Sequence, residues 1–169
     1  VVYVDGLQMT ITLTETQRVS ALVLSAESGG DNGPLFIDIQ SGFVIDIGLN
    51  DNNENFGLTI SESPDKGKPF ITNIILDYED GKMTLTFNET IDVTPTTLVN
   101  LSKIFLVNTT GDKLIGLVNA PVSTVTSSEG LNVTITLSEQ QRAKAIAFSG
   151  SKGGDNTPIR VDSLAGAFA

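Results

Sequence analysis

The sequence predicts an all-β protein built from tandem antiparallel β-sandwiches, each with one short crossover helix. The first observation is that residues 6–38 and 130–162 align without a gap, with about half of their positions identical, which indicates tandem repeats. The second is that apolar and polar residues alternate over short runs, the period of a half-buried strand. The third is that turn signals recur roughly every 8–12 residues in the second part of the chain, as is typical of sandwiches.

Within the duplicated stretch, the period changes from that of a strand to that of a helix. Residues 130–137 (GLNVTITL) and their counterpart 6–13 (GLQMTITL) alternate apolar and polar residues, which predicts a strand in each copy. Ser138 with Gln141, and Thr14 with Gln17, match a capping box, so we expect a short helix after each strand. A Gly-Gly-Asp-Asn loop ends that helix, and a further strand is expected at 158–164 and at 34–40.

The remainder of the first part contains fewer regular signals. Strands are expected at 1–5, 40–49 and 56–60, with a polar loop at 50–55 between the last two. Residues 61–69 (SESPDKGKP) are rich in Pro, Gly and charge and read as a linker. We therefore expect residues 1–66 to be the C-terminal half of one repeat plus a linker, and residues 67–169 to be a second, nearly complete repeat.

The second part opens with two predicted hairpins. Alternating apolar residues flank Asp80-Gly81, a strong signal for a two-residue hairpin turn between strands at 74–78 and 83–87. A crossover follows at 88–100, then a second hairpin from 104–107 and 114–118, and a strand at 120–126. Ile135, Leu137 and Ile146 are expected to be central core residues of this repeat.

Composition limits the chemistry. The chain has no Cys, no His and no Trp, and a formal net charge of −10. Without His or Cys the usual catalytic bases and nucleophiles are missing, so we expect no enzyme. The acidic balance argues against nucleic-acid partners, which favour Lys and Arg. No apolar run approaches the roughly 20 residues of a membrane span, so no membrane insertion is expected in this segment.

The order of these elements resembles a known family. Residues 80–95 (DGKMTLTFNETIDVTP), the hairpin after them, 127–147 (SSEGLNVTITLSEQQRAKAIA) and 153–169 (GGDNTPIRVDSLAGAFA) are similar to the Ig-like repeats, bacterial-type or SwmB-like, of large secreted cell-surface, adhesion and appendage proteins. The resemblance covers nearly all of 68–169 and, as a C-terminal half, 1–63. It implies a non-enzymatic, extracellular or cell-surface structural module without a cofactor.

The resemblance leads to two alternative functions. The first is a structural repeat of a surface fibre, appendage or adhesin stalk, whose partners are neighbouring repeats or copies of itself in a fibre. The alternative is an adhesin module that binds a carbohydrate or another ligand. In addition, residues 1–63 are expected to expose an apolar face and unpaired strand edges, to be completed either by a preceding portion of the chain or by strand complementation from a neighbouring molecule.

Four sequons are the strongest candidate sites. Asn88, Asn100, Asn108 and Asn132 each begin an N-x-Ser/Thr triplet, the acceptor for N-linked glycans. Asn88 is expected at a strand end, Asn100 in a crossover, Asn108 in a hairpin turn and Asn132 on the outward face of a strand. The alternative explanation is that Asn and Thr are simply common on polar strands.

An acidic, Asn-rich run is a candidate metal site. Asp51, Asn53 and Glu54, with Asp46 before them, offer the oxygen ligands that calcium prefers. Asp77, from the second repeat, could complete a calcium site at the junction between the domains. The spacing matches no EF-hand, and the alternative is an acidic loop that is merely solvated.

Overall fold

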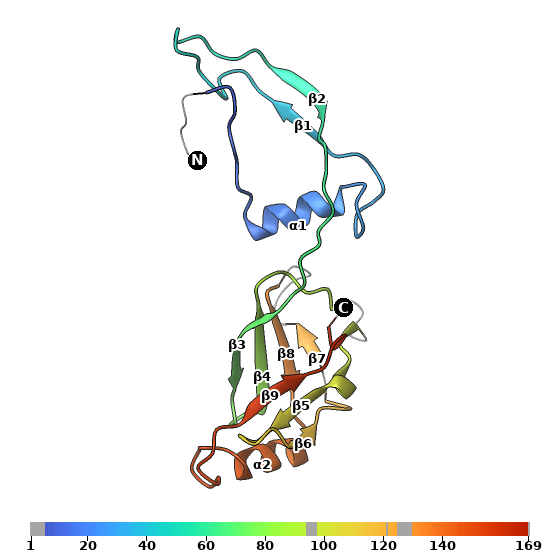
Figure 1. Ribbon diagram of the computed structural model, residues 1–169, viewed down its shortest axis with the longest axis vertical. Coiled ribbons are helices and arrows are strands. Elements are labelled where there is room, and N and C mark those ends of the chain that lie inside the picture. Colours follow the sequence, from blue (N-terminus) through green and yellow to red (C-terminus); the bar gives the residue numbers. More distant parts are fainter. Residues whose placement is uncertain (1–5, 94–97, 121, 125–129, 169) are drawn as a thin grey trace. The chain divides into compact units, whose positions relative to one another are not determined.

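The computed structural model of the chain describes residues 6–93, 98–120, 122–124 and 130–168, so the strand expected at 1–5 lies outside the described residues. The chain divides into two compact units, unit 1 (Val1–Lys68) and unit 2 (Pro69–Ala169). The fold is β-rich, with three small antiparallel sheets and few helices (Figure 1).

Unit 2 contains a four-stranded antiparallel sheet in the order β3-β4-β8-β7. Its strands are β3 (Ile71–Leu76), β4 (Lys82–Phe87), β7 (Val122–Thr124) and β8 (Asn132–Thr136). The first predicted hairpin is therefore confirmed, but its connection is the loop 77–81 rather than a two-residue turn. That loop is closed by a 2.8 Å hydrogen bond from Asp77 N to Lys82 O, and Gly81 adopts the positive φ of 72° that the turn requires.

The second sheet of unit 2 has three strands in the order β6-β5-β9. β5 (Ile104–Val107) follows a short 3-10 helix, η2 (Leu101–Lys103), and pairs with β6 (Lys113–Gly116) as the predicted second hairpin. Its other edge pairs with β9 (Arg160–Ser163). β9 is thus an edge strand, as is β3 in the other sheet.

Both sheets of unit 2 contribute side chains to one hydrophobic core. Met83 and Leu85 from β4 and Ile104 and Leu106 from β5 are completely buried. Two of the three predicted core residues are confirmed, because Ile135 is fully buried and Leu137 is 5% exposed. The prediction for Ile146 is wrong: this side chain is only partly buried, and the small Ala145 is the helix residue that enters the core.

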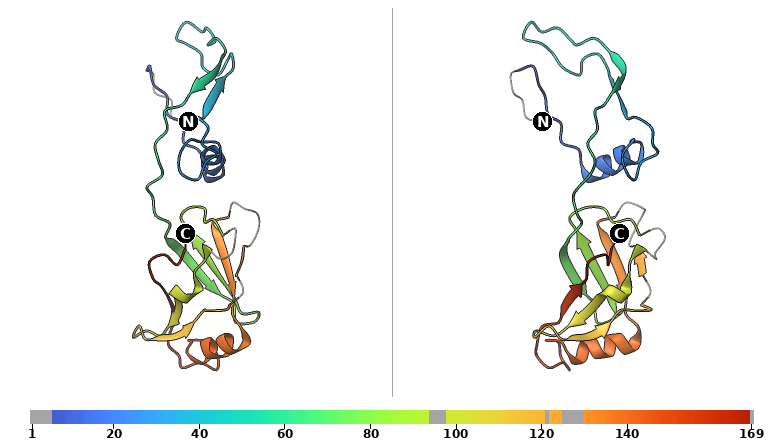
Figure 2. Two further views of the ribbon diagram at one scale, coloured as in Figure 1. Left: turned by 90° about the vertical axis from the view of Figure 1, so that its right-hand side faces the viewer. Right: turned by 45° about the vertical axis from the view of Figure 1, so that its right-hand side comes forward.

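Helix α2 (Glu139–Ala147) links the two sheets of unit 2, because it follows β8 and precedes β9. It lies at one end of the sheets (Figures 1 and 2). The predicted capping box is confirmed: the N–H of Gln141 donates to the Ser138 hydroxyl, and the N–H of Ser138 donates to the Gln141 side chain. Gln141 also donates from Nε2 to Gly116 O at 2.9 Å, which joins α2 to the end of β6.

Unit 1 contains the counterpart helix and one hairpin. Helix α1 (Glu15–Val23) has the same capping box, from Thr14 and Gln17. β1 (Phe36–Ile39) pairs with β2 (Asn55–Thr59) as a two-stranded antiparallel sheet. The strands predicted at 6–13 and 40–49 are wrong: the first is unpaired among the described residues, and the second contributes only an isolated bridge between Ile45 and Asp51.

The two copies of the duplicated strand differ because their neighbours differ. In unit 2, β8 lies between β4 and β7 and is hydrogen-bonded to both. The described residues of unit 1 provide no such neighbours. Ile11 is accordingly 52% exposed where its counterpart Ile135 is fully buried, and Leu13 is 50% exposed where Leu137 is 5% exposed.

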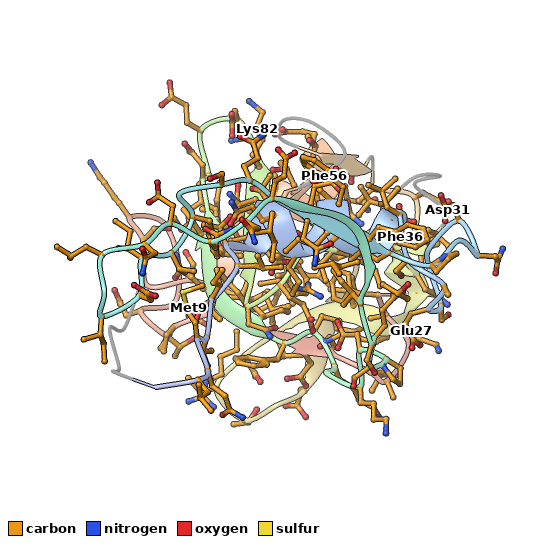
Figure 3. All side chains as sticks on the ribbon, turned by 90° about the horizontal axis from the view of Figure 1, so that it is seen from above. Met9, Glu27, Asp31, Phe36, Phe56 and Lys82 are labelled. Carbon is orange, nitrogen blue, oxygen red and sulfur yellow. The ribbon has the colours of Figure 1, made fainter. Side chains whose placement is uncertain are left out.

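Unit 1 exposes most of its large apolar side chains. Met9, Phe36 and Phe56, labelled in Figure 3, are 46%, 55% and 56% exposed. Among the described residues of this unit, the one buried side chain is that of Ser25. Unit 1 therefore has an apolar surface where unit 2 has a core.

Candidate functional site

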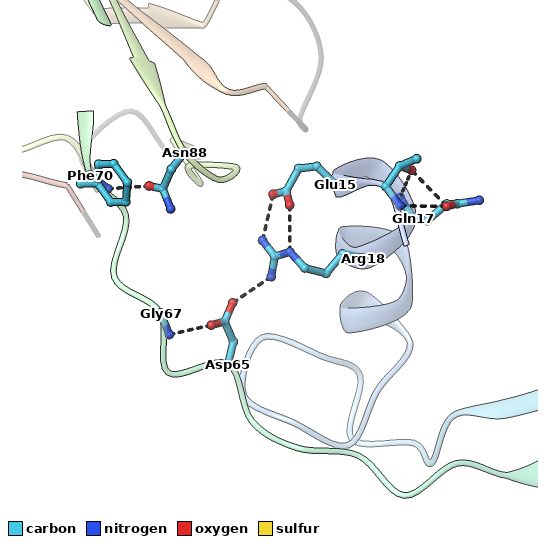
Figure 4. A network of polar contacts seen from close by, with 8 residues as sticks. Glu15, Gln17, Arg18, Asp65, Gly67, Phe70 and Asn88 are labelled. Carbon is cyan, nitrogen blue, oxygen red and sulfur yellow. Dashed lines mark hydrogen bonds and ion pairs between the residues drawn. The ribbon is translucent and has the colours of Figure 1, made fainter. Parts of the chain in front are cut away.

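The feature that occurs in both units is a helix followed by a Gly-Gly-Asp-Asn loop. In unit 2, Arg142 contacts both carboxylate oxygens of Glu139, at 2.8 Å each, and donates from Nη1 to Tyr78 O at 2.7 Å. In unit 1, Arg18 contacts Glu15 in the same way, at 2.8 and 2.9 Å. Its Nη1 donates to Asp65 at 2.8 Å (Figure 4). Each arginine thus joins its helix to a loop distant in the sequence.

A buried serine joins the end of each helix to the loop. The Ser149 hydroxyl donates to Ile146 O at 2.8 Å and accepts from the N–H of Ser151 at 3.1 Å. In unit 1, the Ser25 hydroxyl donates to Leu22 O at 2.7 Å and accepts from the N–H of Glu27 at 3.2 Å. Both serines are almost completely buried. The two helix carbonyls also accept from backbone N–H groups, so the new partner that each serine supplies is an acceptor for a loop N–H.

The second glycine of each loop is required by close packing. A Cβ at position 154 would collide with the Ser149 carbonyl and lie 2.6 Å from Ile146 O. A Cβ at position 30 would collide with Ser25 O in the same way and lie 2.7 Å from Leu22 O. The asparagine two residues later has a positive φ in both units, 67° for Asn32 and 66° for Asn156, a conformation that Asn tolerates better than most residues.

The loop aspartates bind backbone within their own loops. Asp155 accepts from the N–H and the hydroxyl of Thr157, at 2.9 and 2.6 Å. These hydrogen bonds lower the pKa of Asp155, the one from the hydroxyl more than the one from the N–H. Asp31 accepts from the N–H of Gly33 at 2.8 Å. The polar groups of the motif thus stabilise its own turn.

Three of the four predicted glycosylation residues lie at turns. Asn88 is exposed, and its Oδ1 accepts from Phe70 N at 2.7 Å. Asn100 is exposed at the N-terminus of η2, and its Oδ1 accepts from the Ser102 hydroxyl at 2.6 Å. Asn108 is partly buried in the β5–β6 turn, and its Oδ1 accepts from the Thr110 hydroxyl at 2.7 Å. In all three, the amide oxygen rather than the amide nitrogen forms these bonds.

The fourth sequon is the least accessible of the four. Asn132 lies on β8, an inner strand of its sheet, opposite Thr86. Its side chain is partly buried, and its Oδ1 is buried without a hydrogen-bond partner among the described residues. Thr134, the hydroxyl residue of this sequon, is 1% exposed. This strand face is more covered than the outward face expected from the sequence.

The candidate calcium ligands of unit 1 are exposed. Asp51, Asn53 and Glu54 all lie on the surface. The Asp46 carboxylate accepts from the backbone N–H and the side-chain amide of Asn50, at 2.8 and 3.0 Å, and these bonds lower its pKa. Within the described parts of the chain, no three acidic side chains form a group that could hold a metal ion.

The remaining candidate ligand, Asp77, belongs to unit 2. Its Oδ1 accepts from the N–H of Glu79 at 2.8 Å, within the loop that joins β3 to β4. Calcium binding by these five residues therefore stays a prediction.

Unit 2 also has an open cleft between its two sheets, which the sequence did not indicate. It has a volume of about 570 Å³ and is lined by residues 69–74 at the start of β3 and by Val161, Ser163 and Phe168 at and after β9. Phe87 and Phe168, in edge-to-face contact with centroids 4.8 Å apart, also line it. No single stretch of sequence could signal this cleft, because its two walls are far apart in the chain.

The comparisons with known proteins add no relative. No family model, no curated protein and no solved structure matches this chain.

Proposed function

We propose that the chain is a non-enzymatic structural repeat of an extracellular surface fibre, appendage or adhesin stalk, built from tandem Ig-like modules. The observation that carries the proposal is the duplicated helix and loop. The capping box, the Arg–Glu pair, the buried serine and the close-packed glycine recur in both units with nearly the same distances. Repetition of a structural motif is typical of repeat arrays, in which each unit contacts its neighbours.

The arrangement of strands supports an Ig-like assignment for unit 2. Its four-stranded and three-stranded antiparallel sheets share one core, which is the layer arrangement of Ig-like sandwiches. Unit 1, with its exposed apolar side chains, supports assembly by strand complementation. An apolar surface of this kind is a marker of protein–protein contact.

The polar chemistry also favours a structural role. The sequence lacks His and Cys, and several acidic groups of the motif, such as Glu139 and Asp155, are engaged in hydrogen bonds that hold the fold. Among the described residues, no helix is long and apolar enough to cross a membrane. The partners proposed are neighbouring repeats, with N-linked glycans on the exposed sequons.

Surface labelling tests this proposal. Antibodies raised against unit 2 are applied to intact and to permeabilised cells of the source organism. We expect labelling of intact cells, arranged along fibres or appendages in immunogold electron microscopy. Labelling that appears only after permeabilisation contradicts an extracellular role.

The alternative is an adhesin module that binds a carbohydrate or another ligand. Phe70 favours it, because this ring is 61% exposed and lines the cleft of unit 2 together with the polar residues Thr72, Asn73 and Ser163. An aromatic ring with nearby polar groups is a common arrangement in ligand sites. Saturable binding on a glycan array that is lost in Phe70→Ala supports this alternative, and absence of binding leaves the structural role as the better account.

A further inference from the structure

The outer edge of β9 has a counterpart in unit 1 that is occupied by a strand. β9 and β1 are equivalent strands of the duplicated stretch, with Val161 at the position of Ile37 and Asp162 at that of Asp38. β1 pairs with β2, with Ile37 opposite Leu58. β9 pairs with β5 on one side and is the last strand of its sheet on the other.

The hydrogen bonds show that β2 pairs with the edge of β1 that corresponds to the outer edge of β9. Leu164 N donates to Lys103 O at 2.9 Å, so residues 160, 162 and 164 direct their backbone groups toward β5. Residues 159, 161 and 163 therefore direct theirs to the opposite edge, because backbone groups alternate along a strand. In unit 1, Ile60 N donates to Leu35 O at 3.0 Å, and Leu35 is the counterpart of Ile159. β2 thus occupies the edge that, among the described residues, has no strand partner in β9.

The same edge of β9 adjoins the cleft described above. Val161 and Ser163 line that cleft together with Phe70, Phe87 and Phe168. Ile159 and Val161 also pack against the core of unit 2. Residues paired directly across two strands place their side chains on the same face. A strand added in the β2 register would therefore place its Leu58 and Ile60 positions over the aromatic side chains of the cleft.

We propose that the outer edge of β9 and the adjoining cleft form an acceptor site for a β2-type strand of another repeat unit of this kind. In this register, Leu58 lies opposite Val161, and Ile60 N donates to Ile159 O. Addition of a strand to an open sheet edge is an established mode of recognition. This inference deepens the proposed function and rests on its view of the two units as copies of one module.

A specific polar contact favours a β2-type strand over other extended segments. In unit 1 the pairing is irregular between Ile37 and Ile39, and Gly57 there has a positive φ of 67°. Its N–H donates to the Asp38 carboxylate at 2.7 Å, so that the side chain satisfies the donor that the bulge removes from the ladder. Asp162 preserves this carboxylate in unit 2 and is exposed on β9. A strand with Gly at this position would restore the contact.

Burial of exposed apolar side chains of a β2-type strand supplies a driving force for its addition to β9. β2 is mostly exposed in unit 1, and the side chains of Leu58 and Ile60, which the register places over the cleft, are only partly buried there. In the cleft, the apolar side chains of such a strand would be covered by the walls formed by Phe70 and Phe168. Burial of apolar area favours association.

The test uses the full chain, isotope-labelled and kept dilute, titrated with a synthetic peptide of residues 53–62 (NENFGLTISE). The amide signals of Ile159, Val161 and Ser163 are expected to shift saturably and to exchange more slowly with solvent. The matched control peptide is residues 6–13 (GLQMTITL), which is apolar and extended but has no glycine at the bulge position. A Leu58→Asp version of the first peptide is expected not to bind.

A chain variant tests the register. Asp162→Ala is expected to weaken binding of the 53–62 peptide by about tenfold, the loss of one charge-assisted hydrogen bond. Because Asp162 is exposed, the fold of this variant should be retained, as the unshifted amides of β4 and β8 report. Three results overturn the proposal: no shift at β9, shifts confined to β1 or β3, or equal binding of the 6–13 peptide. Undiminished binding to Asp162→Ala overturns the register. If the peptide does not bind, the proposed extracellular location of the protein is not contradicted. If labelling is restricted to permeabilised cells, that location is contradicted, and the acceptor site at β9 is not.

Discussion

Arg142 donates a hydrogen bond of 2.7 Å to the backbone oxygen of Tyr78, so that one side chain of α2 holds the loop between β3 and β4. The same guanidinium contacts both oxygens of Glu139. Lysine carries the charge but lacks the planar, multidentate geometry, so it cannot form all three bonds. We therefore expect that lysine cannot replace Arg142 without a loss of stability.

We expect Arg142→Lys to lower the free energy of unfolding more than the same substitution at an exposed arginine does, because lysine cannot keep all three hydrogen bonds. Urea denaturation at pH 7 measures the change. Arg160→Lys is the control, because Arg160 is exposed on β9, and it should change stability by less than about 0.5 kcal/mol. Equal effects of the two substitutions would show that the Tyr78 contact contributes nothing.

The duplicated leucines provide an internal comparison of burial. Leu137 is 5% exposed and Leu13, its counterpart, is 50% exposed. Leu137→Ala is expected to cost about 2–5 kcal/mol, as for other buried leucines, and Leu13→Ala less than about 1 kcal/mol. Chemical denaturation of the two variants in parallel checks this. A loss below about half a kcal/mol for Leu137→Ala would mean that this side chain is not part of the core.

The sequence predicted well those elements whose determinants are local. The two capping boxes, the glycine loops and both hairpins of unit 2 follow from residues close together in the chain. The strand expected at 6–13 has no partner strand in the part of the chain that the structure describes, although its alternating pattern matches that of 130–137. Pairing depends on remote partners such as β4 and β7, and the periodicity of one segment does not report whether its partners are present.

Gly154 is expected to tolerate no side chain. A Cβ there would collide with Ser149 O and lie 2.6 Å from Ile146 O, both backbone atoms that cannot move aside cheaply. Gly154→Ala should destabilise unit 2 by about 1–3 kcal/mol, as overpacking does. Gly150→Ala is the matched control, because its Cβ would come no closer than 3.8 Å to Thr157 O. Thermal denaturation of both variants decides the matter, and similar melting temperatures would contradict the packing argument.

Acid should destabilise unit 2 through its hydrogen-bonded carboxylates. The pKa of Glu139 is lowered by its hydrogen bond to Arg142, that of Asp80 by its hydrogen bond to Lys82, and that of Asp155 by Thr157. A carboxyl group whose pKa is lower in the folded state stabilises the fold above its unfolded pKa. That stabilisation is lost as the pH falls through the folded pKa.

The free energy of unfolding is therefore expected to decrease as the pH is lowered below about 4. Asp155→Asn should make this decrease smaller. Asp162→Asn, which removes the same charge from an exposed position, controls for the net charge of the chain. The check is urea denaturation at a series of pH values. Identical pH profiles of wild type and Asp155→Asn would exclude a contribution from the loop carboxylate.

The candidate sites were predictable to different degrees. Sequons are visible as triplets, and the structure places Asn88 after β4, Asn100 before η2 and Asn108 between β5 and β6, close to where the sequence predicted them. The burial of the Asn132 side chain could not be predicted from the alternating pattern of residues 130–137, because the neighbouring strands of the sheet cause it. The cleft beside β9 was missed for a similar reason, since Phe70 and Val161 come together only when the two sheets form.

The glycosylation prediction can now be ordered by accessibility. Asn88 and Asn100 are exposed, Asn108 is partly buried in a turn, and the Asn132 amide oxygen is buried on an inner strand. Transfer of a glycan requires that the Asn side chain and the hydroxyl of its triplet be reachable. Thr134 is 1% exposed in the folded unit.

We therefore expect glycans on Asn88, Asn100 and Asn108 of the native protein, and the lowest occupancy on Asn132. Glycopeptide mapping by mass spectrometry of protein from the source organism measures each occupancy. Thr134→Val removes the fourth sequon while preserving the shape of the side chain, and it is expected to leave the glycan mass almost unchanged. Unmodified asparagine at all four positions would rule out glycosylation. A fully occupied Asn132 would mean that the glycan is attached before β8 pairs with β4 and β7.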